Sequence, residues 1–219
     1  AMKSTENAEN SALVAVITGD LVGSSKLSGE AFSQVIINLE RLLKSFRARY
    51  DAAFDIFRGD SFQLVVAPPL AARLATMIDL SLRSGEPAVA VRQCIGIGKG
   101  DAPGQNVKTA TGEAYALSGH GLDKLKGRGL TIASADKAFT EHCELLTRFF
   151  DSHLDRLTAT QAQVVLAYLM ADNKSHEHLA RVLDKKRSNV TRILNTSQYH
   201  LITDYLAHFA AQVKKDFAP

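Results

Sequence analysis

The sequence predicts an α+β protein, with a ferredoxin-like domain followed by an all-α helix-turn-helix module. Three observations lead to this fold class. Residues 12–133 alternate strand-like and helix-like apolar patterns in the order β-α-β-β-α-β, followed by a further helix and a short strand. Only helical periods come after them, in a connecting helix at 134–156, which Ser134 can cap, and a helix-turn-helix module at 157–219. In the first part, two apolar runs stop at Gly-Asp pairs, a dipeptide typical of turns.

The first predicted strand, within 12–25, is a run of apolar, mostly β-branched residues that ends at Gly19-Asp20. Residues 54–66 place two apolar segments around Gly59-Asp60, the pattern of a β-hairpin with an acid at its tip. Caps, periodicity and chain breakers define the other elements. They are a helix from Ser28 to about Tyr50, a helix opened by Pro68-Pro69, a strand at 89–98, a loop at 101–106, a helix at 112–126 and a short strand at 130–133. The alternating glycines Gly96, Gly98 and Gly100 predict that another backbone packs closely on the strand at 89–98. We expect the helices to pack on one face of the sheet.

Asp20 and Asp60 are the leading candidates for a functional site, because both carboxylates come at strand ends. If the two lie close together, a hard divalent cation such as Mg²⁺ or Mn²⁺ would relieve their repulsion and hold a phosphate. Amide groups of a turn also bind phosphate, because their N–H groups converge on the anion. The alternative is that each Asp only closes a turn.

Both acidic segments resemble cyclase motifs. Asp20-Leu-Val-Gly-Ser-Ser25 is similar to the Asp-Ile-x-Gly-Phe-Thr motif of class III nucleotidyl cyclases, and Gly59-Asp60 to their second metal-binding pair. Arg58-Gly-Asp-Ser-Phe62 also resembles the Gly-Gly-Asp-Glu-Phe (GGDEF) signature of diguanylate cyclases. The likeness covers about residues 12–133. Together with the helix-turn-helix tail, the layout most resembles the SatD-like bacterial proteins.

The resemblance implies that Asp20 and Asp60 hold Mg²⁺ or Mn²⁺ and that a purine nucleotide binds beside them. The nucleotide's phosphates would meet the turn residues around the two acids, which are Leu21, Val22, Gly23, Ser24, Ser25 and Gly59.

The departures from the cyclase pattern matter equally. Ala116 stands where the catalytic Asn belongs, and His120 where the transition-state Arg belongs. Ile56 replaces the base-selecting Lys, while Arg58 and Ser61 replace a Gly and the Glu of the diguanylate signature. The residues expected to bind metal and phosphate are present, but those needed for cyclisation are not. We therefore expect no cyclisation and assign no catalytic residue.

The C-terminal part predicts three short helices and a longer one. Thr158 and Gln161 have the spacing of a capping box, and Ser175 can cap the next helix. The spacing that follows resembles a helix-turn-helix, although Asp184 stands where Gly is usual. The outward residues of its second helix have side chains suited to phosphates and base edges of duplex DNA. They are Lys186, Arg187, Ser188, Asn189, Thr191 and Arg192. The alternative is a scaffold for protein contacts.

The last helix, about 198–217, has a nearly heptad-like apolar seam. It either covers the helix-turn-helix or pairs with a second subunit, and we expect a homodimer. Cys94 and Cys143 form no Cys-x-x-Cys pair, which favours reduced, buried thiols.

The net charge of +3 does not by itself argue for nucleic acid. No apolar run is long enough to span a bilayer, and residues 1–10 lack the apolar core of a signal peptide, so we expect a cytoplasmic protein with no membrane partner. The sequence thus predicts a regulatory protein with a degenerate cyclase-like domain that binds metal and nucleotide, and a DNA-binding helix-turn-helix. The alternatives are an active nucleotidyl or phosphoryl transferase and a structural protein-interaction module.

Overall fold

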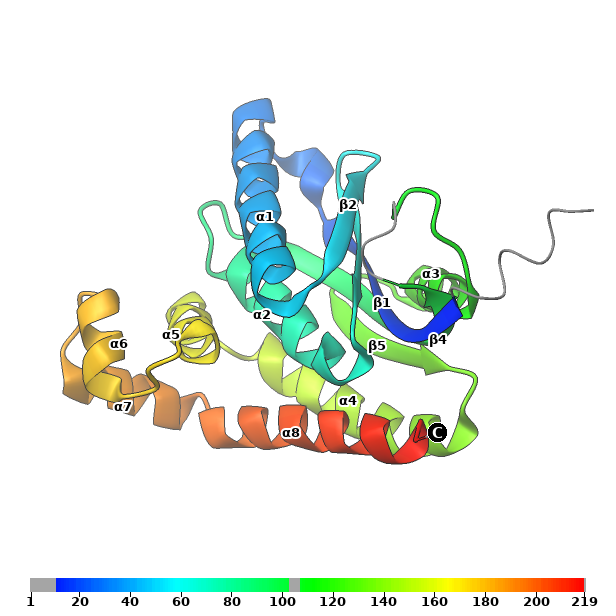
Figure 1. Ribbon diagram of the computed structural model, residues 1–219. Helices are drawn as coiled ribbons and strands as arrows, with labels where there is room; N and C mark the ends of the chain where they lie inside the picture. The colour runs from blue at the N-terminus through cyan, green and yellow to red at the C-terminus, as the bar shows by residue number, and fades with distance from the viewer. Residues whose placement is uncertain (1–10, 103–106, 219) are drawn as a thin grey trace, which may run out of the picture.

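The computed structural model describes residues 11–102 and 107–218 (Figure 1). Residues 1–10, where we expect no signal peptide, and most of the predicted 101–106 loop lie outside these ranges. The elements are, in order, β1 (Ser11–Val22), η1 (Ser24–Lys26), α1 (Gly29–Tyr50), β2 (Ala53–Phe57), β3 (Ser61–Val66), η2 (Pro68–Leu70), α2 (Ala71–Arg83), β4 (Ala90–Asp101), α3 (Glu113–Lys124), β5 (Gly129–Ser134), α4 (Lys137–Asp155), α5 (Ala159–Met170), α6 (His176–Val182), α7 (Arg187–Thr196) and α8 (Tyr199–Asp216). Within the described ranges, no helix is both long and apolar enough to cross a membrane.

The five strands form one mixed sheet in the order β2-β3-β1-β4-β5. β1 pairs antiparallel with β3 and β4, and β2 pairs antiparallel with β3. This is the strand order of a β-α-β-β-α-β ferredoxin-like unit, to which β5 adds in parallel at the β4 edge. The predicted fold class is therefore confirmed: an α+β domain is followed by a helical region.

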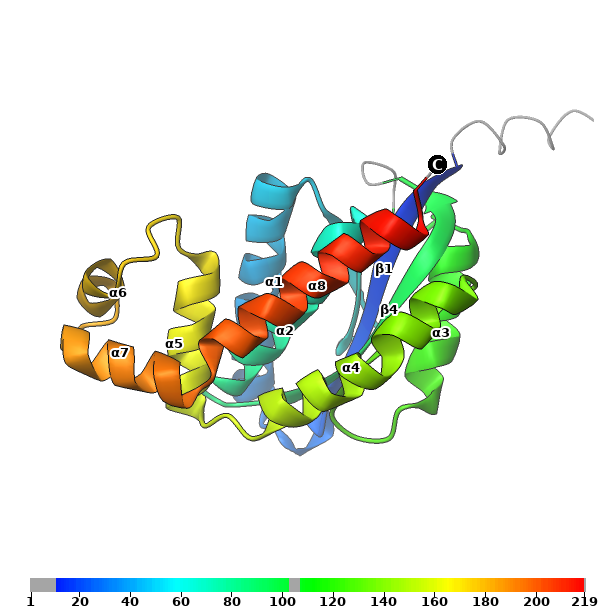
Figure 2. The ribbon, with the colours of Figure 1, turned by 90° about the horizontal axis from the view of Figure 1, so that it is seen from below.

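The sheet has two unlike faces, because neighbouring side chains on a strand point in opposite directions. Ile17 and Ile95 point to one face, where they belong to the main apolar core beneath α1 and α2. Val14 and Val16 point to the other face and pack with Ala114 of α3. Figure 2 shows the sheet between α2 on one side and α3 on the other. The prediction that the helices lie on one face only is therefore wrong.

Gly96 of β4 explains why α3 fits on that second face. A Cβ at this position would lie 2.3 Å from the carbonyl oxygen of Ala114 and 2.6 Å from the amide nitrogen of Ser118. The missing side chain thus lets two backbones approach closely, as the alternating glycines of this strand predict. A buried hydrogen bond of 2.7 Å between the hydroxyls of Thr18 and Ser118 fastens α3 to β1.

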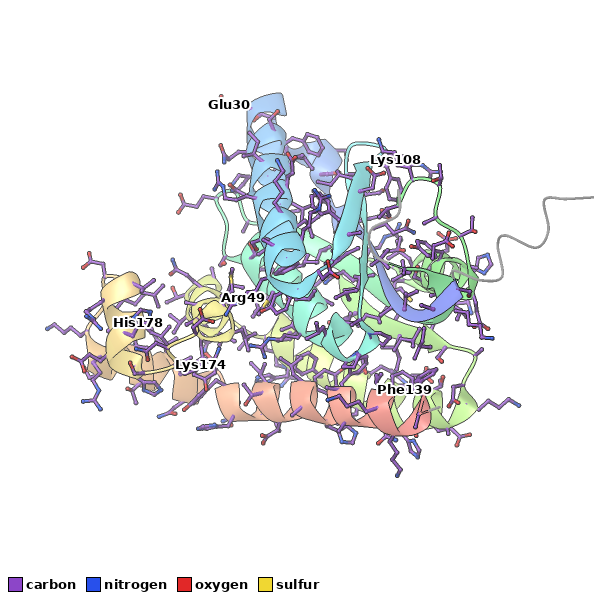
Figure 3. All side chains as sticks on the ribbon, in the orientation of Figure 1. Glu30, Arg49, Lys108, Phe139, Lys174 and His178 are labelled. Atoms are coloured by element: carbon purple, nitrogen blue, oxygen red, sulfur yellow. The ribbon has the colours of Figure 1, made fainter. Side chains whose placement is uncertain are left out.

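The C-terminal helices pack directly on the sheet domain. α5 contacts α2, and α8 contacts both α4 and η2. Arg83 at the end of α2 donates to the main-chain carbonyls of Leu154 and Leu157. Arg49, labelled in Figure 3, donates from α1 to the carbonyl of Met170 at 2.6 Å. One cluster of buried apolar residues accordingly extends from the sheet to α8.

A buried ion network reinforces this junction. Arg128, in the turn before β5, lies 3.2 Å from Asp79 of α2 and 2.8 Å from Asp151 of α4. Arg83 reaches the same Asp79 at 3.5 Å. Burial raises the pKa of Asp151, and the neighbouring Arg128 opposes that rise. Because breaking one partner of a buried pair leaves an uncompensated charge, the network fixes the turn before β5 relative to α2 and α4.

The helix caps that the sequence predicts are observed in the structure, except at α4. The predicted caps at Ser28, Thr158 and Ser175 are confirmed. At α4, Asp136 rather than Ser134 accepts the hydrogen bond of the third helical amide, at 2.7 Å. The Ser134 hydroxyl instead accepts from the amide of Asp136 at 3.0 Å. The helix therefore begins later than predicted.

Candidate functional site

Asp20 lies near the end of β1, between two partners on the neighbouring strands. The sheet register places it directly opposite Ser61 of β3 and Arg92 of β4. The Ser61 hydroxyl donates to Oδ1 of Asp20 at 2.5 Å. Arg92 donates to Oδ2 from Nε at 3.2 Å and from Nη2 at 2.7 Å. Both oxygens of the carboxylate are therefore engaged within the protein.

Asp60 follows a tight hairpin turn between β2 and β3, as the sequence predicts. Arg58 and Gly59 have positive φ angles of 53° and 88°, as the two central residues of a type I′ turn do. The hydroxyl of Ser24 donates to Oδ2 of Asp60 at 2.8 Å, and the amide of Leu21 donates to its carbonyl at 3.0 Å. These two bonds hold the hairpin tip against the segment that leaves β1.

The two aspartates line one cavity of about 270 Å³, together with Leu21, Val22, Ser61, Arg92 and Gly127. The structure thus brings together both acids that the sequence singles out. Of the residues expected to meet phosphate, Leu21 and Val22 belong to the lining. Gly23 has a left-handed φ of 76°, and Ser24 and Ser25 begin η1 beside it.

Arg92 is the site residue that sequence reasoning missed. Besides Asp20, it reaches the turn before β5, because its Nη1 donates to the carbonyl of Leu125 at 2.8 Å. The sequence feature that could have identified it is a single charged side chain within the otherwise largely apolar strand at 89–98. Only the β1–β4 register turns that signal into a contact with the aspartate.

A divalent cation held by Asp20 and Asp60 would have to compete with Arg92 for the carboxylate of Asp20. Carboxylate oxygens suit Mg²⁺, which keeps several water ligands and needs few protein ligands. Within the described ranges, however, no three His, Cys, Asp or Glu side chains group as a metal cluster would require. Asp20 and Asp60 are the available ligands, and the Arg92 guanidinium already holds Oδ2 of Asp20.

A second, wider cavity of about 570 Å³ lies along β2 and β3. Its lining includes Phe57, Gln63 and Tyr115, and also Lys108, which is 3.8 Å from Asp55. Lys108 is labelled in Figure 3 beside β2. Residues alternate along a strand, so Gln63 points to the same face as Ser61 of the first cavity. Both cavities therefore lie on the face of the sheet that carries α3.

Tyr115 is a hydrogen-bond donor of this wider cavity that stays protonated at neutral pH. Burial, together with the nearby Asp101, raises the pKa of Tyr115 to about 12. Its hydroxyl donates to the main-chain carbonyl of Asp101 at 3.2 Å. The amide of Gln63 donates to the hydroxyl of Thr18 at 3.3 Å. An aromatic ring, an amide and an ion pair at one place suit a flat polar ligand.

The two positions at which the sequence resemblance expects the catalytic Asn and the transition-state Arg lie apart from both cavities. Ala116 and His120 are exposed on α3, and neither belongs to the lining of either cavity. Ile56 lines the wider cavity, where it offers no charge to a base.

The helix-turn-helix candidate residues gather at the beginning of α7. Lys186 precedes the helix without a side-chain cap, and Arg187 opens it. Asp184, in the turn before it, has a φ of 50°, which explains why Gly is usual at this position. Arg192 donates to the side-chain carbonyl of Asn189 at 2.7 Å.

Among the other candidates, Ser188 is exposed, as predicted. Thr191 differs from the predicted outward orientation, because it is half-buried and its hydroxyl lies 2.7 Å from Nδ1 of His176 on α6.

The sequence matches no protein-family model and no curated protein, and the SatD-like resemblance stays a prediction. Solved cyclase structures are similar over about half of the chain. The dimeric guanylyl cyclase domain of the RhoGC fusion protein from the aquatic fungus Blastocladiella emersonii is 16% identical, with 56% of this chain and 80% of that chain covered and a TM-score of 0.45.

Two further structures show the same distant similarity. The catalytic core of a rhodopsin-guanylyl cyclase with converted specificity, in complex with ATPalphaS, is 16% identical, covers 57% of this chain and 80% of its own, and has a TM-score of 0.45. The adenylyl cyclase CyaB from P. aeruginosa is 15% identical, covers 56% of this chain and 76% of its own, and has a TM-score of 0.43.

Proposed function

We propose that this chain is a regulatory protein whose sheet domain binds a purine nucleotide with Mg²⁺ or Mn²⁺ and whose α7 contacts duplex DNA. The observation that carries the first half is the cavity shared by Asp20 and Asp60, which are far apart in sequence. Asp20 and Asp60 would hold the cation. When bound, the cation would supply positive charge for the phosphates.

The protein's own groups support phosphate binding beside that cation. Gly23 lies in an exposed turn with a left-handed φ, and such turns present backbone N–H groups to an anion. Arg92, once displaced from Asp20 by the cation, has a guanidinium free for a phosphate oxygen, which planar N–H donors bind well. The wider cavity along β2 and β3 offers Phe57 and Tyr115 to a purine ring.

Thermal unfolding with nucleotide and cation tests this half, because a ligand selective for the folded state must stabilise it. Mn²⁺ with ATP or GTP should raise the melting temperature of the parent, and Asp20→Asn or Asp60→Asn should remove the response. Asp51→Asn, at an exposed position after α1, is the matched control and should respond like the parent. If both site variants respond like the parent, the shared cation site is wrong.

The DNA-binding half rests on the composition and exposure of the first turn of α7. Lys186 and Arg187 are exposed where the helix begins, and no side chain caps its free amides. A helix N-terminus with basic side chains suits a DNA phosphate.

Selection from a random duplex library, with and without nucleotide, should enrich a sequence. No enrichment together with no salt-sensitive binding to bulk DNA would leave the module as a protein-contact scaffold.

A further inference from the structure

The turn before β5, residues 125–128, contacts both the acidic cavity and the buried ion network. Gly127 belongs to the lining of the cavity that the two aspartates share. The next residue, Arg128, extends its guanidinium to Asp79 of α2 and Asp151 of α4. One short segment therefore joins the candidate site to the two helices on which α5 and α8 pack.

Side chains at its two ends hold this turn in place. At the first end, Nη1 of Arg92 donates to the carbonyl of Leu125 at 2.8 Å. At the other end, the side chain of Arg128 is only 13% exposed within the ion network. Between them, Lys126 and Gly127 are exposed, and within the described ranges neither makes a main-chain hydrogen bond. The position of the turn therefore depends on the two arginines.

Arg92 contacts the site and the turn through one planar group. Nε and Nη2 of its guanidinium donate to Oδ2 of Asp20, while Nη1 donates to Leu125. Because the three nitrogens lie in one rigid plane, they move together. A guanidinium that swings away from Asp20 therefore also withdraws its donor from the turn. The side chain thus has two discrete positions, one that holds both partners and one that holds neither.

The ion network continues from the turn towards the C-terminal module. Asp79, which binds Arg128, lies 3.5 Å from Arg83 on the same helix. Arg83 donates to the carbonyls of Leu154, in the last turn of α4, and of Leu157, two residues before α5 begins. Contacts therefore run without a gap from the carboxylate of the site to the connection between α4 and α5.

We propose that Arg92 and the turn at 125–128 form a latch that couples the acidic cavity to the connection between α4 and α5. In the closed position, Arg92 pairs with Asp20 and holds Leu125. When Asp20 binds a divalent cation instead, the guanidinium swings away and the turn loses one of its two attachments. The cation step rests on the proposed function, whereas the latch itself rests on the contacts of Arg92.

Such coupling must be reciprocal. If a cation on the aspartate loosens the turn, then loosening the network at the other end of the turn must ease cation binding by the same factor. The connection between α4 and α5 leads into the module whose α7 we propose to contact DNA. The latch would therefore give the cavity a route to that helix.

Hydrogen exchange of the full chain tests the latch without any ligand. In Arg92→Gln, amides of 125–130 and of 154–158 should exchange at least about threefold faster than in the parent, because both segments open locally more often. Amides of α1 should be unaffected, which excludes a global loss of stability. Arg41→Gln, at an exposed position on α1, is the matched control and should exchange like the parent.

Mn²⁺ alone tests the step at the cavity. It should speed exchange in the same two segments of the parent, and have no effect on Asp60→Asn, which loses a proposed ligand but keeps Arg92 on Asp20. The reciprocal effect is measured by calorimetry in Asp151→Asn, which should bind Mn²⁺ about threefold more tightly although Asp151 is not part of the cavity lining. Glu144→Gln, exposed on the same helix, removes the same charge and should bind like the parent.

The outcomes separate the latch from the proposed function. A parent that binds Mn²⁺ without faster exchange in either segment would overturn the latch and leave the cation site standing. Exchange at 154–158 that is unchanged in Arg92→Gln, or an unchanged Mn²⁺ affinity in a folded Asp151→Asn, would also overturn it. If the parent binds no Mn²⁺ while Arg92→Gln speeds exchange in both segments, the cation part of the proposed function fails and the latch stands.

Discussion

Arg92 donates two hydrogen bonds to one oxygen of Asp20, at 3.2 and 2.7 Å, from the position directly opposite on the neighbouring strand. The guanidinium therefore supplies at Asp20 the positive charge that a divalent cation would supply. Any cation that binds this carboxylate would have to compete with Arg92, so the arginine would lower the cation affinity of the proposed site.

Arg92→Gln should therefore bind Mn²⁺ more tightly than the parent. The ion pair is partly exposed, so its removal is worth about 1 kcal/mol, or about fivefold in the dissociation constant measured by calorimetry. Adding Asp20→Asn to this variant should abolish the gain. An unchanged Mn²⁺ affinity in Arg92→Gln would show that the cation does not use Asp20.

Incubation with ATP or GTP and Mn²⁺ should give no cyclic or dimeric nucleotide. Positioned cations and hydrogen-bond donors supply much of the transition-state stabilisation in such reactions, and Ala116 and His120 stand where a cyclase would carry Asn and Arg. Chromatographic product analysis checks this. Metal-dependent turnover that disappears in Asp60→Asn would instead establish the transferase alternative.

Arg187→Ala and Arg192→Ala should weaken DNA binding and flatten its salt dependence, by a slope of about one for each lost phosphate contact. Asn189→Ala should instead reduce discrimination between sequences, by about 1–3 kcal/mol for a bidentate base contact. Its side-chain carbonyl is held by Arg192, so this contact requires that bond to open. Lys44→Ala on α1 is the control for a general loss of charge. Equal effects of all four changes would argue against a specific role for α7.

Gly96→Ala should destabilise the protein by about 1–3 kcal/mol, since the added methyl group overlaps backbone atoms that cannot yield. Gly119 on α3 is the matched control, because no atom lies within 4 Å of a Cβ there. Gly119→Ala should stabilise the helix by up to about 1 kcal/mol. Urea unfolding of the two variants measures both changes, and a neutral Gly96→Ala would show that α3 can shift outward.

Neither cysteine should react with an alkylating reagent at pH 8 while the protein is folded. Burial raises the pKa of Cys94 to about 12 and that of Cys143 to about 11. The thiolate is the reactive form, so both groups stay neutral and inert until the chain unfolds. Mass spectrometry with and without denaturant checks this, and labelling of native Cys94 would reveal opening between α3 and β4.

The local features of this fold could be predicted from sequence, because they depend on nearby residues. The apolar strand that carries Asp20 near its end, the hairpin turn before Asp60 and the capping box at Thr158 are each specified by a few neighbours. At α4 two neighbouring residues could both act as the cap, and the sequence does not rank Ser134 against Asp136.

Features that depend on the register of the strands, or on which face of the sheet a helix covers, could not be predicted from the sequence. Arg92 becomes a site residue only through its alignment with Asp20 across two strands. The glycine at 96 predicts a close approach but not the sheet face on which it occurs. Thr191 has a residue type suited to DNA, and only the packing of α6 shows that its hydroxyl is engaged by His176.

The contact between α8 and α4 has a consequence for how the protein is made. Phe150 stacks on Tyr205 with ring centroids 3.8 Å apart, and Phe139 meets Phe209 at 5.6 Å. A chain growing on the ribosome completes α4 well before it completes α8. During that interval, the apolar side chains of α4 that face α8 have no partner, and a nascent chain is exposed to aggregation there. Slow synthesis of the last helix, or a stop codon before it, should therefore harm solubility more than any single substitution on the surface.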